Sequence, residues 1–139
     1  MERSLIEKAR ELLNKNLPTT TLSTVDKDYN VNVAVISILE MIDDETIICA
    51  RFGAERTYRN LQETKKGVFM VLSVDERGTK DGIRVYVELV GDETGGPNFE
   101  RIQERLAKTR YGRFPLKNCL VFRITDIQPV STLAKKDES

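Results

Sequence analysis

The stretch RFGAERTYRNL, residues 51–61, concentrates side chains that could hold an anion. It contains three arginines, Arg51, Arg56 and Arg59, and Thr57 follows the second of them directly. A glycine precedes a helix-like run here, and the first turn of a helix presents unpaired N–H groups and a partial positive charge. A cation in that turn opposes the helix dipole, so the position of Arg56 needs an explanation.

The neighbours along the helix account for one arginine but not for the other. Arg59 has an acid one turn away on either side, Glu55 and Glu63, which is a favourable arrangement on a helix face. Arg56 has no acid at either helical spacing. An anion bound by the free N–H groups, the Arg56 guanidinium and the Thr57 hydroxyl would explain the pattern. The alternative is an ion pair between Arg56 and an acid elsewhere in the fold.

The composition excludes several classes of function. A chain of 139 residues is long enough for one domain with a sizeable core. Lys+Arg and Asp+Glu both count 22, so no overall field attracts nucleic acid or an anionic membrane. The sequence has no histidine, which removes histidine-based triads and histidine-ligated zinc or haem. We predict no metal site, no nucleic-acid partner and no membrane partner.

The cysteines and the N-terminus indicate the compartment. Cys49 and Cys119 each lie in an apolar run and are predicted to be buried free thiols, with a cross-strand disulfide as the alternative. Residues 1–12 are charged and lack the apolar region of a signal peptide, and no run is long enough to span a membrane. We therefore expect a cytoplasmic protein.

The hydrophobic pattern predicts a mainly β domain over residues 1–139, with flanking helices. Helices are expected over 3–14 and 54–64, with Gly67 marking the end of the second, and a third helix begins at Pro97. A loop is expected over 75–82. Strands are expected over 19–26, 31–42, 46–52, 68–74, 83–91 and 118–130, joined mostly as hairpins, and residues 133–139 form a frayed tail. This order predicts a small antiparallel barrel of six strands with helices at its ends.

Three segments in this order, STVDKDYNVNVAVIS, DDETIICARFGAERTYRNL and GVFMVLSV, resemble the FMN-binding split-barrel superfamily related to pyridoxamine 5'-phosphate oxidase. The resemblance covers residues 19–91, with a looser match of the last strand. It implies a six-stranded split barrel that forms a homodimer, with FMN bound at the interface between the subunits.

The resemblance also assigns cofactor contacts residue by residue. The basic residue and threonine that hold the FMN phosphate in the family match Arg56 and Thr57. The strand that lines the flavin ring matches Ala34, Val35, Ile36 and Ser37, and the end of the third strand, Ala50, Arg51 and Phe52, is expected beside the ribityl chain and ring. Flavin chemistry adds that a cation near the ring edge would stabilise the reduced ring, and Arg51 and Arg84 are candidates for it. For Arg84 we prefer the interpretation of a plain strand-surface residue.

The function implied by the resemblance is that of an oxidoreductase passing hydride or electrons through bound FMN, between a small-molecule donor and acceptor. The cofactor supplies this chemistry, so no catalytic side chain is expected. A non-catalytic FMN-binding or electron-transfer protein and a deazaflavin-dependent reductase are the alternatives. The substrate-binding arginine and histidine of true pyridoxamine 5'-phosphate oxidase have no counterpart here, so that activity is not expected.

The stretch KTRYGRFPLK, residues 108–117, is basic with interleaved aromatic residues. It could contact nucleic acid, contact FMN across a dimer, or form a solvated loop. We expect the loop, with Tyr111 or Phe114 reaching a partner subunit as the second interpretation.

Overall fold

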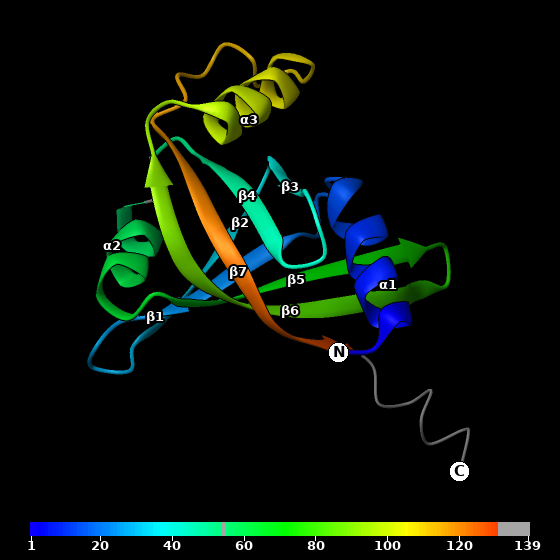
Figure 1. Cartoon of the computed structure of the whole chain (residues 1–139). Coiled ribbons are helices and arrows are strands. Elements are labelled where there is room, and N and C mark those ends of the chain that lie inside the picture. The colour runs from blue at the N-terminus through cyan, green and yellow to red at the C-terminus, as the bar shows by residue number, and fades with distance from the viewer. Residues whose placement is uncertain (54, 131–139) are drawn as a thin grey trace.

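The computed structural model describes residues 1–53 and 55–130, and its seven strands form one antiparallel sheet that curls into an open barrel (Figure 1). The elements are α1 (Arg3–Asn14), β1 (Thr21–Val25), β2 (Val31–Val35), β3 (Leu39–Met41), β4 (Thr46–Arg51), α2 (Glu55–Thr64), β5 (Lys66–Asp75), β6 (Gly78–Glu93), α3 (Pro97–Ala107) and β7 (Asn118–Pro129). The strand order is β2-β1-β5-β6-β7-β4-β3. The predicted split barrel with flanking helices is confirmed, whereas the predicted tail at 133–139 lies outside the described residues.

The sheet has one strand more than the predicted six, because residues 31–42 form two strands instead of one. β2 pairs with β1, and β3 pairs with β4, at opposite ends of the sheet order. Between them, the N–H of Ile36 donates to the Thr20 carbonyl oxygen and the N–H of Ala50 donates to the Ile38 carbonyl oxygen, both at 3.0 Å. Residues 36–38 therefore carry the chain from one edge of the sheet to the other.

Two further expectations are corrected around β5. The loop predicted over 75–82 shrinks to a tight turn, because β5 and β6 stay paired as far as Asp75 and Gly78. Gly67, which the sequence suggested as the end of α2, lies in β5, and the left-handed residue after the helix is Lys65, with φ of 65°. Gly67 instead permits the close approach of β1, since a Cβ there would lie 3.3 Å from the Ser23 carbonyl oxygen.

Side chains from the sheet and from α1 fill the interior of the barrel. Helix α1 buries Ile6, Ala9, Leu12 and Leu13 in this core. Phe69 of β5 and Phe122 of β7 meet there edge to face, with ring centroids 5.2 Å apart. A second cluster lies on the outer face of β4 and β7, where α3 covers it with Ile102 and Leu106.

These two buried faces separate the cysteines. Cys49 points into the interior cluster and Cys119 points into the cluster under α3. Their strands are adjacent, with Cys49 opposite Leu120 and Cys119 opposite Ala50, but the two thiols lie on opposite faces of the sheet. Both thiols are free and buried, as predicted, and burial raises the pKa of each to about 12.

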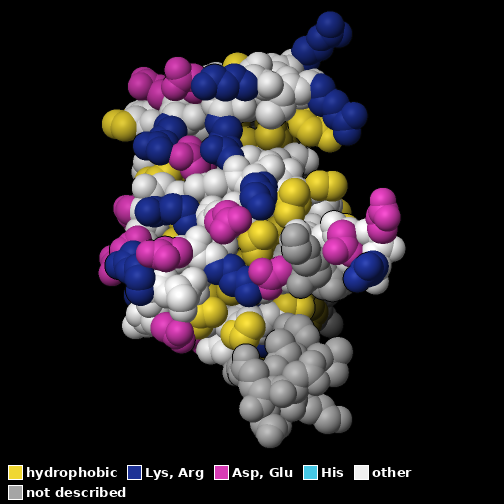
Figure 2. All heavy atoms as spheres, turned by 90° about the vertical axis from the view of Figure 1, so that its right-hand side faces the viewer, with side chains coloured by type: hydrophobic (Ala, Val, Ile, Leu, Met, Phe, Trp, Pro, Cys, Tyr) yellow, Lys and Arg dark blue, Asp and Glu magenta, His cyan; other side chains and the backbone are white. Residues whose placement is uncertain are grey.

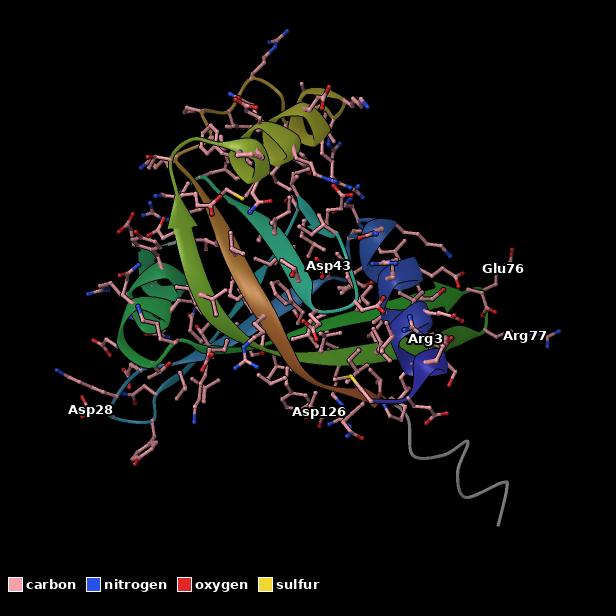
Figure 3. The ribbon with its side chains drawn as sticks, in the orientation of Figure 1. Arg3, Asp28, Asp43, Glu76, Arg77 and Asp126 are labelled. Atoms are coloured by element: carbon pink, nitrogen blue, oxygen red, sulfur yellow. The ribbon has the colours of Figure 1, made fainter. Side chains whose placement is uncertain are left out.

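The surface mixes charges of both signs. Figure 2 shows Lys and Arg side chains interspersed with Asp and Glu on one face of the molecule. Lys8 of α1 pairs with Asp81 at 2.6 Å. Glu76 and Arg77 project from the tip of the hairpin that joins β5 to β6 (Figure 3). In the described part of the chain, no helix has the length and apolar character needed to cross a membrane.

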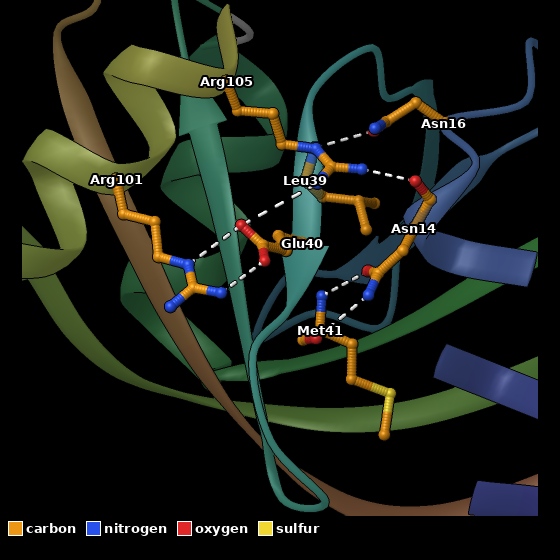
Figure 4. Close-up of polar contacts among 7 residues, drawn as sticks. All are labelled: Asn14, Asn16, Leu39, Glu40, Met41, Arg101 and Arg105. Carbon is orange, nitrogen blue, oxygen red and sulfur yellow. Dashed lines mark hydrogen bonds and ion pairs between the residues drawn. The ribbon is translucent and has the colours of Figure 1, made fainter. Parts of the chain in front are cut away.

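Glu40 of β3 joins three elements (Figure 4). Arg101 of α3 donates to its two carboxylate oxygens at 3.1 and 2.7 Å, and Nη1 of Arg105 lies 3.8 Å from Oε1. Arg105 also donates to the carbonyl oxygen of Asn14, the last residue of α1. The Asn14 side chain binds the backbone N–H and carbonyl of Met41 at 2.7 and 3.1 Å. These contacts fix α1 and α3 on either side of β3.

We expect Glu40→Gln to lower the free energy of unfolding at neutral pH by about 1–3 kcal/mol, because two arginines lose a largely buried charged acceptor. The hydrogen bonds from Arg101 hold the pKa of Glu40 below its ordinary value. Its contribution is therefore present above the unfolded-state pKa and is lost as the pH falls through the lower folded-state pKa. Urea unfolding at neutral and acidic pH measures this difference.

In that experiment the difference in free energy of unfolding between wild type and Glu40→Gln should become smaller at acidic pH, because the wild-type carboxyl is then protonated and uncharged. Glu104→Gln is the matched control, because Glu104 is an exposed acid on α3, the helix that carries Arg101 and Arg105. An equal loss of stability at both pH values would contradict the electrostatic role assigned to Glu40.

Candidate functional site

A hollow opens where β4 ends, between α2 and the chain that leaves β2. Its walls contain most of the residues that the sequence predicted for a cofactor site: Val35, Ile36, Ser37, Ala50, Arg51, Phe52 and Thr57. They come from three segments that are separate in the sequence, and the curled sheet and α2 bring them together. A set chosen from sequence therefore shares one concave surface.

The remaining two predicted residues do not line this hollow. Ala34 lies on β2 opposite Leu22 of β1, and its side chain points to the other face of the strand from Val35. Arg56 is exposed on α2 and lines a neighbouring hollow. The two hollows lie close together, since Arg56 is followed directly by Thr57, which lines the first.

Five wall residues were not among the predicted contacts: Leu22, Cys49, Gly53, Tyr58 and Leu120. Leu22 and Leu120 enter the wall through strand pairing, because they lie opposite Ala34 and Cys49. Cys49 was interpreted as core, and it is buried, but it also borders the hollow. For Tyr58 a signal exists in the sequence, since it is the one aromatic residue in the polar helix ERTYRNLQET.

Arg51 is the largely buried charge of the site, with its side chain 11% exposed. Its Nη1 donates to Oδ1 of Asn118 at 2.6 Å, and its Nη2 donates to Oε1 of Glu55 at 2.9 Å. The guanidinium carbon lies 3.6 Å from the centre of the Tyr58 ring. A cation that is both paired and stacked on a ring is held in one orientation.

Asp92 of β6 connects the groups that surround Arg51. Its carboxylate accepts hydrogen bonds from the Tyr58 hydroxyl, from Nδ2 of Asn118 at 2.8 Å and from Nε2 of Gln62 at 3.2 Å. Because Tyr58 and Asn118 both contact Arg51, the four residues form a closed ring of contacts. The hydrogen bond to Asp92 raises the pKa of Tyr58.

Thr57 is 5% exposed and is oriented by its neighbours. Its Oγ1 accepts a hydrogen bond from Nδ2 of Asn32 at 3.0 Å, which leaves the hydroxyl proton available for an acceptor in the hollow. One turn later, Nδ2 of Asn60 donates to Oγ1 of Thr24 at 3.1 Å, and Leu61 is fully buried. These contacts seat α2 on the sheet.

The predicted pairing of Arg59 with Glu55 and Glu63 is wrong. Glu55 pairs with Arg51, and Oε2 of Glu63 accepts the N–H of Lys27 at 3.1 Å. Local helical spacing could not reveal these partners, because both come from other elements.

Arg56 and Arg59 are both exposed, and neither forms an ion pair within the described residues. They border the same hollow, of about 480 Å³, together with Asp26 and Glu63. The pKa of Asp26 is lowered chiefly by its hydrogen bonds from Asn30, with a smaller contribution from the charge of Arg56. The first two turns of α2 therefore carry two arginines that form no ion pair with a described residue.

Arg84 lines neither of these hollows. Its Nη2 donates to the carbonyl oxygen of Pro129 at 2.9 Å, which favours the strand-surface role. Within the described ranges, no group of His, Cys, Asp or Glu residues could hold a metal ion.

Solved structures similar to this chain include a protein of high sequence identity and others of low identity. No protein-family model and no curated protein matches the chain. An FMN-binding protein from Syntrophomonas wolfei subsp. wolfei has a structure with a TM-score of 0.90 and 64% identity, and the match covers 94% of this chain and 89% of that one.

Two distant structures share the fold. HupZ from Group A Streptococcus is 20% identical, with a TM-score of 0.72, and the match covers 91% of this chain and 94% of that one. A Lactobacillus delbrueckii protein described as a candidate pyridoxamine 5'-phosphate oxidase is 17% identical, with a TM-score of 0.64, and the match covers 92% and 93%. The FMN-binding protein, at 64% identity, is similar enough to establish a family.

The closed ring of contacts among Arg51, Tyr58, Asp92 and Asn118 can be tested by titrating Tyr58. We expect Asp92→Asn to lower the pKa of Tyr58 toward its ordinary value, because the carboxylate that disfavours the phenolate is removed. Absorbance of the phenolate against pH measures the shift, and Tyr58→Phe identifies the transition. Asp28→Asn, in the exposed turn between β1 and β2, is the control (Figure 3). An unshifted Tyr58 transition in Asp92→Asn would show that Asp92 does not control this hydroxyl.

Proposed function

Because the chain belongs to the FMN-binding split-barrel superfamily related to pyridoxamine 5'-phosphate oxidase, we propose that it binds FMN in the hollow at the end of β4 and acts as an oxidoreductase. The observation that carries this proposal is one concave surface that unites strand residues suited to a planar ring with Thr57 and the first turn of α2. When bound, FMN would supply the transfer of hydride or electrons between a small-molecule donor and acceptor.

The walls of the hollow fit a flavin ring. Val35, Ile36 and Phe52 offer apolar surface on which a planar ring can lie. β2 is an outermost strand of the described sheet, so the N–H and carbonyl groups along one of its edges have no strand partner among residues 1–53 and 55–130. Such an edge matches the alternating donors and acceptors of the flavin. Arg51 adds a fixed positive charge, which favours electron density on a nearby ring.

The start of α2 fits the phosphate. A phosphate monoester carries nearly two negative charges at neutral pH. The N–H groups of the first helical turn, the Thr57 hydroxyl and the Arg56 guanidinium are suited to it. Arg59, which lacks the partners expected from sequence, borders the same hollow as Arg56 and adds a second cation.

A second copy of the chain would complete the site. The hollow has a cavity volume of about 110 Å³, less than the roughly 300–1,000 Å³ typical of small-molecule sites. Beside it, one face of β2 exposes Val31, Val33 and Val35 by 69%, 61% and 69%. Val31 also borders an apolar hollow of about 370 Å³ that extends toward β5 and β6. Exposed apolar surface continuous with an incomplete site favours a homodimer through this face.

We expect Arg56→Glu to weaken FMN binding by roughly 100-fold or more, because it replaces a phosphate-binding cation with a like charge. Arg59→Ala should weaken it by about threefold, as expected for the loss of a second, exposed cation. Quenching of FMN fluorescence on titration with protein measures both changes.

Arg77→Ala, at the tip of the β5–β6 hairpin, is the control and should bind FMN as the wild type does. Equal FMN affinity in all variants would show that the phosphate is bound elsewhere. A wild-type protein that takes up no FMN would overturn the proposed function. An oxidoreductase is expected to oxidise reduced nicotinamide when loaded with FMN. Absence of turnover with any donor would instead favour a non-catalytic FMN-binding or electron-transfer protein.

The proposed dimer face is tested by a charge on β2. Val33→Asp should yield a monomer in light scattering and bind FMN at least about tenfold more weakly, because a buried carboxylate without a partner is costly. Circular dichroism should be unchanged, since the side chain is 61% exposed in one subunit. Val74→Asp, at a residue 55% exposed and far along β5, is the matched control. A dimeric Val33→Asp with normal FMN affinity would exclude this face.

A further inference from the structure

The segment 108–117, which joins α3 to β7, carries four cations and no acid: Lys108, Arg110, Arg113 and Lys117. None of the four forms an ion pair within the residues that the structure describes. Arg101 and Arg105, on the helix just before it, both pair with Glu40. The lack of acidic partners is therefore a property of this segment, which we call the basic lip.

The basic lip has a defined shape. Its own turns are closed by hydrogen bonds from the N–H of Gly112 to the Thr109 carbonyl at 3.2 Å and from the N–H of Phe114 to the Tyr111 carbonyl at 3.0 Å. Tyr111 and Leu116 pack against the cluster beneath α3. The four cations therefore lie on a segment whose backbone is held by hydrogen bonds and packing, at the top of the molecule in Figure 1.

The basic lip also adjoins the proposed FMN hollow. Phe114 meets Phe52, a wall residue of that hollow, with ring centroids 6.4 Å apart. The N–H of Lys117 donates to the carbonyl oxygen of Arg51, another wall residue, at 2.9 Å. Phe114 remains 56% exposed, and the Tyr111 ring lies 6.2 Å from it. Cations and exposed aromatic rings therefore border the hollow together.

We propose that the basic lip binds the phosphate-bearing part of the molecule that exchanges electrons with the flavin, and that this molecule is of the nucleotide type. The inference rests on the proposed function, because the lip would hold its ligand beside that hollow. Unpaired cations attract a polyanion, and exposed rings stack on a planar base. A neutral redox partner would use neither feature.

Nucleic acid fits this surface less well. Tight binding of a nucleic acid backbone needs cations spread over several phosphates. Here the unpaired cations of the lip occupy one short segment of a chain whose net charge is zero. A small phosphorylated molecule matches that extent.

The first experiment measures binding without electron transfer. NADP+ is titrated into the protein by calorimetry at low salt, and Arg110→Gln/Arg113→Gln should raise its Kd by about tenfold, as expected for two exposed charge contacts. Lys65→Gln/Arg77→Gln removes the same charge from two turns outside the lip and should leave the Kd unchanged. Added salt should weaken wild-type binding more than that of the lip variant.

The second experiment uses the FMN-loaded protein. The lip variant should show a raised KM for NADPH with a similar kcat, and normal turnover of an uncharged dihydronicotinamide that lacks phosphate. The affinity of the lip variant for FMN should equal that of the wild type. A wild-type protein that fails to bind FMN would refute the proposed function. The NADP+ titration would still test the proposal that the basic lip binds a nucleotide. Unchanged NADP+ affinity, an equal loss with the uncharged donor, or displacement of NADP+ by single-stranded nucleic acid would overturn the proposal.

Discussion

The short passage of the chain through residues 36–38 is the constraint on which the rest of the structure depends. It joins β2 and β3, which occupy the two ends of the strand order. So few residues can span only a short distance, so the sheet must curl until its edges approach each other. Hydrogen bonds at both ends of the passage, from Ile36 to Thr20 and from Ala50 to Ile38, hold the edges there. The candidate site lies at this junction, and it combines the end of β2 with the end of β4.

The strand that carries the other wall of the site is supported on both faces. β4 buries Ile47 and Cys49 inside the barrel and Ile48 under α3. Glu40 and its two arginines then fix α3 against β3, the neighbour of β4. Residues that leave the end of such a strand are positioned precisely enough to define a binding surface, whereas a free loop would not hold them. Arg51 benefits most, because its orientation also depends on Tyr58 from α2 and Asn118 from β7.

The sequence was informative where the relevant physics is local, and it failed where partners come from elsewhere. The contiguous predicted sets, Val35 to Ser37 and Ala50 to Phe52, do share one hollow, because each set follows directly from a strand end. The run 31–42 was predicted as one strand because alternation of side chains is the same whether or not the strand changes its partner. The predicted partners of Arg59 were wrong because helical spacing cannot show that Glu55 pairs with Arg51 and that Glu63 accepts the N–H of Lys27. Leu22 and Leu120 enter the wall only through the register of distant strands, which composition does not encode.

The distribution of charge separates two kinds of cation in a protein that is neutral overall. Arg51, Arg101 and Arg105 are paired with carboxylates and serve to fix elements in place. Among the described residues, Arg56, Arg59 and the cations of the basic lip form no ion pair. Arg56 and Arg59 border the hollow beside α2, whereas the basic lip adjoins the neighbouring hollow at the end of β4. Screening limits the reach of an exposed charge to about 8 Å at physiological ionic strength. The proposed anion would be attracted by these local clusters, because the chain as a whole has zero net charge and supplies no overall field. A chain with zero net charge can therefore hold the proposed anion site, because acids pair with Arg51, Arg101 and Arg105 and leave other cations without ion-pair partners among the described residues.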